Sequence, residues 1–148
     1  MAGTTRRTFI AGAALVSVLP LASARATPEA MAAAIKEVVG DTAIREGRVT
    51  LDVPPLIENG NTVPVTVSVE SPMSEADHVK AIAIFNESNP QRDVANFFLG
   101  PRAGRATVST RIRLATSQQL VAVAKMSDGS CWSRTVDVLV TLAACVEP

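Results

Sequence analysis

Residues 120–142 read LVAVAKMSDGSCWSRTVDVLVTL, and this stretch predicts the fold. Two apolar runs, Leu120 to Met126 and Cys131 to Leu142, flank the tetrapeptide Ser127-Asp128-Gly129-Ser130. Asp-Gly between two such runs is a strong hairpin signal, because a tight turn needs backbone conformations that Gly adopts freely and Asp tolerates. Valines alternate with polar residues along the second run, as in a strand with one buried face. The stretch therefore predicts two paired antiparallel strands.

The same period of two recurs upstream. Val63, Val65, Val67 and Val69 alternate with polar residues, and residues 108–114 repeat the pattern with arginines on the outer side. Apolar runs at 79–85 and 94–99 predict two further strands. Pro64 cannot donate a ladder hydrogen bond, so we expect its strand at a sheet edge. With turn signals between these segments, residues 48–142 predict an all-β, immunoglobulin-like antiparallel β-sandwich of six or seven strands.

A short N-terminal helix is expected within residues 27–47. Pro28 suits a first helical position, Gly40 suits the stop, and apolar residues between them recur at helical spacing. One stripe of this helix needs a partner surface. The strands at 79–85 and 120–126 are apolar on both faces. This is more hydrophobic surface than the interior of one sandwich requires. Burial under this helix and an interface with another subunit both explain the surplus.

Residues 1–26 are typical of a twin-arginine (Tat) signal peptide. Thr5-Arg6-Arg7-Thr8-Phe9-Ile10 precedes an apolar run from Ala11 to Leu21, which is too short to span about 30 Å of hydrocarbon. Small residues then offer cleavage at Ala22-Ser23-Ala24 or Ala24-Arg25-Ala26. An uncleaved membrane anchor is the alternative. We expect export to the periplasm and no membrane association after cleavage.

Composition excludes several classes of function. The chain has 14 basic and 14 acidic residues, and cleavage after Ala26 removes three arginines and no acid, leaving a net charge of −3. Such a domain has no electrostatic case for binding nucleic acid. His78 is the only histidine, and no phosphate loop, dinucleotide fingerprint, paired-cysteine or haem motif occurs. We therefore expect no metal and no cofactor.

The two cysteines, Cys131 and Cys145, differ in context. An extended run between them covers roughly 46 Å, whereas the Cα atoms of a disulfide lie about 4.4–6.8 Å apart, so an intramolecular bridge is disfavoured. Cys131 is interpreted as an incidental thiol near a turn. Cys145 lies in a short tail, residues 143–148, beyond the last strand. We expect Glu147 and the terminal carboxylate to raise its pKa, so that a partner would have to activate it. This favours a non-enzymatic carrier over a catalyst.

The chain resembles the SoxY family, the sulfur-carrier subunits of the bacterial thiosulfate-oxidising (Sox) system. The resemblance covers essentially all of the mature chain, including the twin-arginine leader and the short helix. It is carried by Glu58 to Val65, by Phe97-Phe98-Leu99-Gly100-Pro101, by the hairpin Met126 to Trp132, and by Val140-Thr141-Leu142 leading to a terminal cysteine.

The resemblance implies a sulfur intermediate attached covalently to Cys145. It also implies a heterodimer with a SoxZ-like subunit and transient contacts with the c-type cytochrome SoxXA, the hydrolase SoxB and, where present, the sulfur dehydrogenase SoxCD. The family's tail is a glycine-cysteine-glycine run, whereas this tail has Ala143 and Ala144 before the cysteine and Val146, Glu147 and Pro148 after it. These residues narrow the accessible conformations of the tail. An exported structural or assembly module, in which Cys145 forms an intersubunit disulfide, is the alternative.

Overall fold

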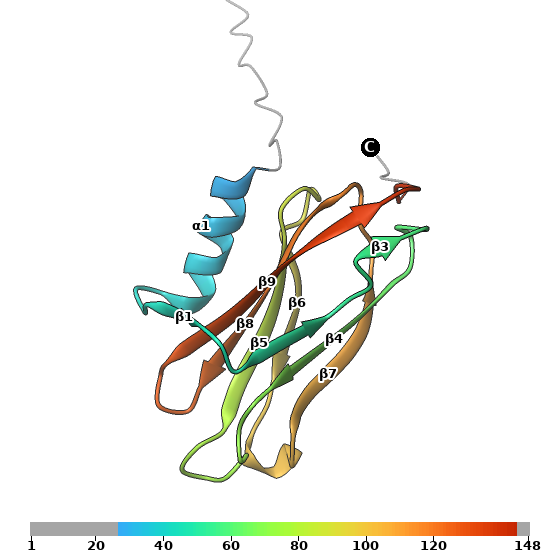
Figure 1. The fold of residues 1–148 in the computed structure, drawn as a ribbon. Coiled ribbons are helices and arrows are strands. Elements are labelled where there is room, and N and C mark those ends of the chain that lie inside the picture. The colour runs from blue at the N-terminus through green and yellow to red at the C-terminus, as the bar shows by residue number, and fades with distance from the viewer. Residues whose placement is uncertain (1–26, 145–148) are drawn as a thin grey trace, which may run out of the picture.

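The computed structural model describes residues 27–144, which form two stacked β-sheets with one helix outside them (Figure 1). The all-β sandwich with a short N-terminal helix is confirmed. The elements are α1 Pro28–Val39, β1 Ile44–Glu46, β2 Val49–Asp52, β3 Leu56–Ile57, β4 Val63–Val69, β5 Val79–Asn86, β6 Asp93–Phe98, the 3-10 turn Pro101–Ala103, β7 Ala106–Ile112, β8 Gln118–Met126 and β9 Cys131–Val140.

The predicted hairpin is the centre of the larger sheet, whose strand order is β1-β9-β8-β5-β6. Strands β8 and β9 pair without interruption from Gln118↔Val138 to Lys125↔Cys131. Gly129 takes a φ of 85° in the turn between them, which is a conformation that favours glycine. The carboxylate of Asp128 accepts hydrogen bonds from the backbone and hydroxyl of Ser130, at 2.8 and 2.6 Å. These two bonds lower the pKa of Asp128 below its usual value.

The smaller sheet has the order β2-β4-β7, which corrects the expectation for Pro64. Its strand, β4, is central and not at the edge. However, β2 pairs with β4 only between Thr66 and Val69, whereas β7 follows β4 as far as Val63. At Pro64 the strand therefore has a neighbour on one side only. Proline is tolerated here because the strand has a local edge at this position. The sequence pattern could not distinguish such a local edge from an edge along the whole strand.

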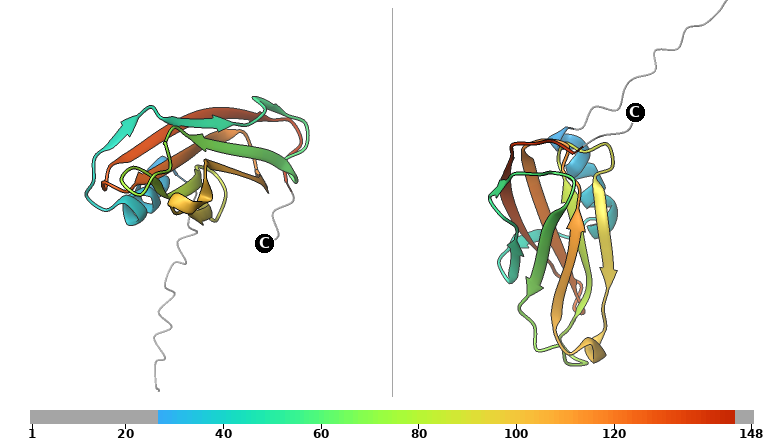
Figure 2. Two further views of the ribbon diagram at one scale, coloured as in Figure 1. Left: turned by 90° about the horizontal axis from the view of Figure 1, so that it is seen from below. Right: turned by 90° about the vertical axis from the view of Figure 1, so that its right-hand side faces the viewer.

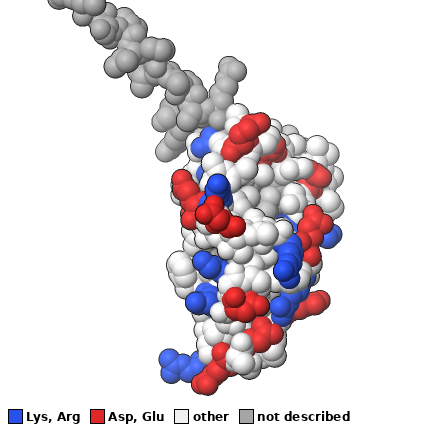
Figure 3. Space-filling view, turned by 90° about the vertical axis from the view of Figure 1, so that its left-hand side faces the viewer, with Lys and Arg blue, Asp and Glu red and all other residues white. Residues whose placement is uncertain are grey.

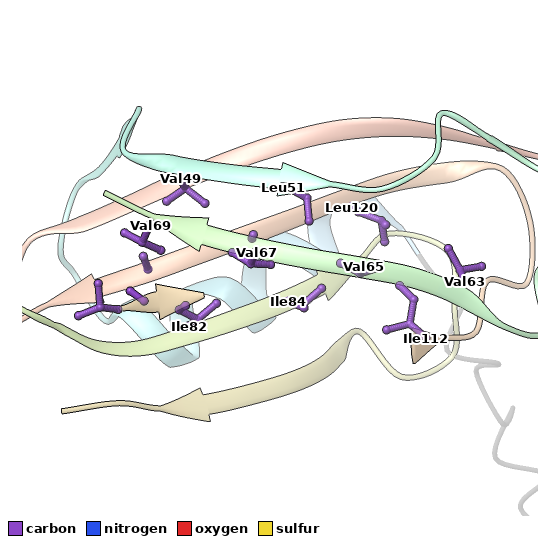
Figure 4. Close-up of a cluster of buried hydrophobic side chains, with 14 of the residues drawn as sticks. Val49, Leu51, Val63, Val65, Val67, Val69, Ile82, Ile84, Ile112 and Leu120 are labelled. Atoms are coloured by element: carbon purple, nitrogen blue, oxygen red, sulfur yellow. The ribbon is translucent and has the colours of Figure 1, made fainter. Parts of the chain in front are cut away.

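The main core fills the space between the two sheets (Figure 4). The four valines of β4 point into it and are almost fully buried, and Ile82 and Ile84 of β5 face them from the other sheet. Burial of each such side chain contributes about 1.5–3 kcal/mol. Alternation in β4 and β7 thus reports one buried face per strand, as the sequence predicted.

A second, smaller core lies on the opposite face of the larger sheet, under α1. Ala83 and Phe85 of β5 and Val121 and Val123 of β8 are buried there against the helix. Figure 2 shows α1 on the side of the larger sheet that faces away from β4. The helix begins at Pro28 after its N-cap Thr27 and ends at Val39, and the capping residue Gly40 has a φ of 68°. Burial under the helix therefore accounts for the apolar outer face of both strands.

Strands β1 and β3 were not anticipated. Strand β1 lies within residues 27–47, expected to be helical, and pairs parallel to β9 from Ile44↔Cys131 to Glu46↔Ser133. Strand β3 pairs parallel to the other end of β9. Both are too short for a periodic signal. They pair in parallel with the two ends of β9, the strand that leads to the tail, whereas the other strands of the sandwich pair antiparallel.

The outer surface of the described part carries mixed charge. Figure 3 shows acidic and basic side chains interspersed over one face, with no large area of a single sign. Within residues 27–144, no helix combines the length and the apolar character needed to span a bilayer.

Candidate functional site: the root of the C-terminal tail

The chain leaves the sandwich after β9, which ends at Val140. Leu142 and Ala143 are exposed, but Ala144 is only 7% exposed. Of the predicted tail residues, Ala143 and Ala144 are therefore described, and they differ in environment. Cys145, Val146, Glu147 and Pro148 lie outside the described residues, so the predicted attachment residue itself stays a prediction. The last described residue is packed against the domain and does not project from it.

Three linked backbone hydrogen bonds connect this root, which we define as Leu142 to Ala144, to Gly60 and Leu114. Gly60 N–H donates to the carbonyl of Leu142 at 2.8 Å, and Leu114 N–H donates to the carbonyl of Gly60 at 2.8 Å. Ala144 N–H then donates to the carbonyl of Leu114 at 3.0 Å. Residues from three distant parts of the chain thus meet at one point. We call this arrangement the backbone knot.

The residues just before the knot are also held. Strand β3 lies beside the end of β9 (Figure 1). Thr141 N–H donates to the carbonyl of Ile57 at 2.9 Å, and its hydroxyl donates to the carbonyls of Ile57 and Glu58 at 3.4 Å. Around these polar contacts, Leu56, Leu139 and Leu142 expose more than half of their surface. The root of the tail is therefore held by hydrogen bonds, and exposed leucines lie within it and beside it.

Cys131, the other thiol, is unsuited to carry a group that enzymes must reach. Its side chain is fully buried in the second core, under α1, and is a free cysteine. Burial raises the pKa of this thiol above its usual value, and the nearby carboxylate of Asp128 raises it further, whereas Lys125 acts in the opposite direction. Its position beside the turn agrees with the sequence interpretation. The interpretation did not include its burial, because the covering helix is distant in sequence.

Sequence reasoning missed the residues of the knot. Gly60 entered only as part of Glu58 to Val65, a segment that carries the family resemblance, and Leu114 only as one member of an alternating strand. Backbone hydrogen bonds leave no mark on residue type, apart from the glycine that a close approach requires. Among residues 27–144, no group of three or more potential ligands of the His, Cys, Asp or Glu type gathers as a metal site would require.

Known proteins resemble this chain in sequence and in fold. Residues 35–145 match the family model described as sulfur oxidation protein SoxY, and the match ends at Cys145. The solved sulfur carrier protein SoxY of Chlorobium limicola f thiosulfatophilum is 32% identical, with a TM-score of 0.65 over 76% of this chain and 96% of that one. A search of curated proteins gives no match.

More distant structures share the fold alone. Superoxide reductase (neelaredoxin) from Ignicoccus hospitalis is 18% identical, with a TM-score of 0.56 over 64% of this chain and 80% of that one. Superoxide reductase from Nanoarchaeum equitans is 11% identical, with a TM-score of 0.56 over 65% of this chain and all of the other. The family match spans most of the chain and the likeness to the Chlorobium protein extends over nearly its full length. This chain belongs to the SoxY family of sulfur oxidation proteins.

Proposed function

We propose that this protein is a periplasmic, non-catalytic sulfur carrier of thiosulfate oxidation, which holds its intermediates covalently on the thiol of Cys145. The observation that carries the proposal is the family match through Cys145, together with a root that holds the chain against the domain as far as Ala144. The buried Cys131 offers no competing site. The twin-arginine leader supports export by the Tat route in a folded state.

The chemistry requires an electron acceptor and a hydrolase, which this domain does not supply. The Cys145 thiol loses its proton and forms a sulfur–sulfur bond to the outer sulfur of thiosulfate. Two electrons pass to a c-type cytochrome of the SoxXA kind. Water then cleaves the terminal sulfonate as sulfate in a SoxB-like hydrolase and leaves a persulfide on Cys145. A SoxCD-like dehydrogenase, where present, oxidises that sulfur further.

A SoxZ-like subunit is the proposed stable partner. Leu56 and Leu139, which are paired across β3 and β9, and Leu142 of the root are exposed. They support a protein contact near the tail, because exposed apolar side chains that lie together are typical of interaction surfaces. Folded-state export through the Tat route would allow a partner without its own signal to cross with this chain.

Intact-mass analysis of protein purified from thiosulfate-grown cells tests the carrier role. We expect a reducible sulfur adduct on the natural protein and on Cys131→Ala, and none on Cys145→Ser. Absence of any adduct during active thiosulfate oxidation would count against the proposal. A stoichiometric covalent dimer in non-reducing electrophoresis of rapidly trapped cells would instead favour a structural module linked through Cys145.

A further inference from the structure

We propose that Gly60 is the positioning residue of the tail. It allows the backbone of Leu114 to lock the chain at Ala144, so that Cys145 starts from a fixed point and not from a loose arm. The locking is independent of the proposed function, and only its consequence for cargo transfer rests on the carrier role.

Gly60 is required by space. A Cβ atom at this position would collide with the carbonyl oxygen of Leu114, and it would lie 2.9 Å from the nitrogen of Ala144 and 3.2 Å from the carbonyl oxygen of Leu142. All three are backbone atoms, which cannot rotate away as the end of a flexible side chain can. The backbone of Gly60 is not in the left-handed region, so steric room alone explains the glycine. Any side chain here must push the knot apart.

The other side of the knot is braced by Asn89. Its amide nitrogen donates to the carbonyl of Arg113 at 2.7 Å, and its amide oxygen accepts from the backbone N–H of Ala115 at 3.0 Å. Both neighbours of Leu114 are therefore held by one side chain. The same oxygen accepts from the buried side chain of Gln118 at 2.9 Å, and the side chain of Leu114 is fully buried in the main core. Leu114 is thus a rigid support for Ala144.

The lock sets how far the attachment residue can travel. Cys145 follows Ala144 directly, so the two Cα atoms are about 3.8 Å apart. If the root were free from Thr141 onward, the same Cα could move within about 14 Å of that residue, at roughly 3.4 Å for each residue. The buried methyl group of Ala144 fits this view. Alanine packs at a fixed root, whereas glycine would serve a swinging one.

Amide hydrogen exchange measured by NMR tests the lock directly. Gly60→Ala is compared with Gly100→Ala, a matched control whose added Cβ would meet nothing within 4 Å and whose φ of −143° suits alanine. Loss of one hydrogen bond corresponds to about a tenfold change in an opening equilibrium. We expect the Ala144 amide to exchange about tenfold faster in Gly60→Ala, the core amide of Val67 to change much less, and Gly100→Ala to behave as the natural protein.

A second variant keeps the test decisive if Gly60→Ala does not fold. Asn89→Ala has no contact with the tail, yet it should also accelerate exchange at Ala144. Asn89→Asp keeps the acceptor for Ala115 and should give a smaller effect. Unchanged protection of Ala144 in the variants that fold, or an unprotected Ala144 amide in the natural protein, would overturn the proposal.

Two rates separate positioning from thiol chemistry and from the carrier role itself. In a Cys131→Ala background, alkylation of Cys145 by iodoacetamide should stay within about twofold in Gly60→Ala, because the thiol is chemically the same. Enzymatic loading with thiosulfate should lose about tenfold in kcat/KM, since misplacing a reacting group by an ångström is enough for such a loss. Equal loading would refute the positioning role. If even the natural protein is not loaded, the carrier role fails while the exchange result stands.

Discussion

Helix α1 covers Cys131, so the alkylation rate of this thiol should report how often the helix lifts from the sheet. The side chain of Cys131 is fully buried, and Met31 of the helix, itself 8% exposed, belongs to the same apolar cluster. Truncation of Met31 to alanine weakens the packing that holds this helix on the sheet without altering the core between the two sheets. Met31→Ala is therefore the perturbation.

The expected magnitude follows from the buried side chain. Replacing a buried methionine by alanine costs about 2–5 kcal/mol. We expect the lower part of this range, about 2–3 kcal/mol, because a helix on the outside of the sheet can settle into the space left behind. Each 1.4 kcal/mol is a factor of ten. The population with the helix lifted, and with it the alkylation rate of Cys131, should rise about 30- to 150-fold.

The assay is the rate of alkylation by iodoacetamide in a Cys145→Ser background, followed by intact mass. The reagent is kept dilute, so that the rate follows the population of the open state. Val65→Ala is the control, because Val65 is buried between the sheets and does not touch this cluster. In Val65→Ala, the alkylation rate of Cys131 should stay within about threefold of the rate without this substitution. Equal acceleration in both variants would show that Cys131 is reached only by global unfolding, and the idea of a local cover would be refuted.

Two further predictions follow. Burial raises the pKa of Cys131, so the folded state holds the thiol proton more tightly than the unfolded state does. The resulting stabilisation is complete below the thiol's unfolded pKa of about 8.5 and is lost as pH rises above it. Urea titrations should therefore show stability falling above that pH in the natural protein and falling less in Cys131→Ala, and identical pH profiles would contradict this. Pro64→Thr should change the free energy of unfolding by less than about 0.5 kcal/mol, as is usual for exposed positions. Thr66 has a strand on both sides, so Thr66→Pro should cost about 1–3 kcal/mol through the lost ladder hydrogen bond. Similar losses in the two variants would refute the local-edge explanation.

The parts of the fold with local signals could be predicted. The Asp128-Gly129 turn and the alternating valines of β4 and β9 report hydrogen-bonded pairs and buried faces that neighbouring residues already determine. The doubly apolar strands were ambiguous, because apolar outer faces look the same whether a helix or another subunit covers them. Phe85 is covered by α1, a choice that depends on where the helix docks. Pro64 was misread because strand length on the other side of β4 is not encoded near it.

The candidate site, too, could be predicted from the sequence only in part. Residue type and position identified Cys145 as the thiol near the chain end, and the alternation along β9 placed it beyond the last strand. The sequence alone did not show that the tail is held up to Ala144. That was decided by contacts between Gly60, Leu114 and Ala144, which are far apart in the chain and join through backbone groups. Because every residue type except proline carries the same backbone donor and acceptor, only the folded arrangement reveals which of them meet.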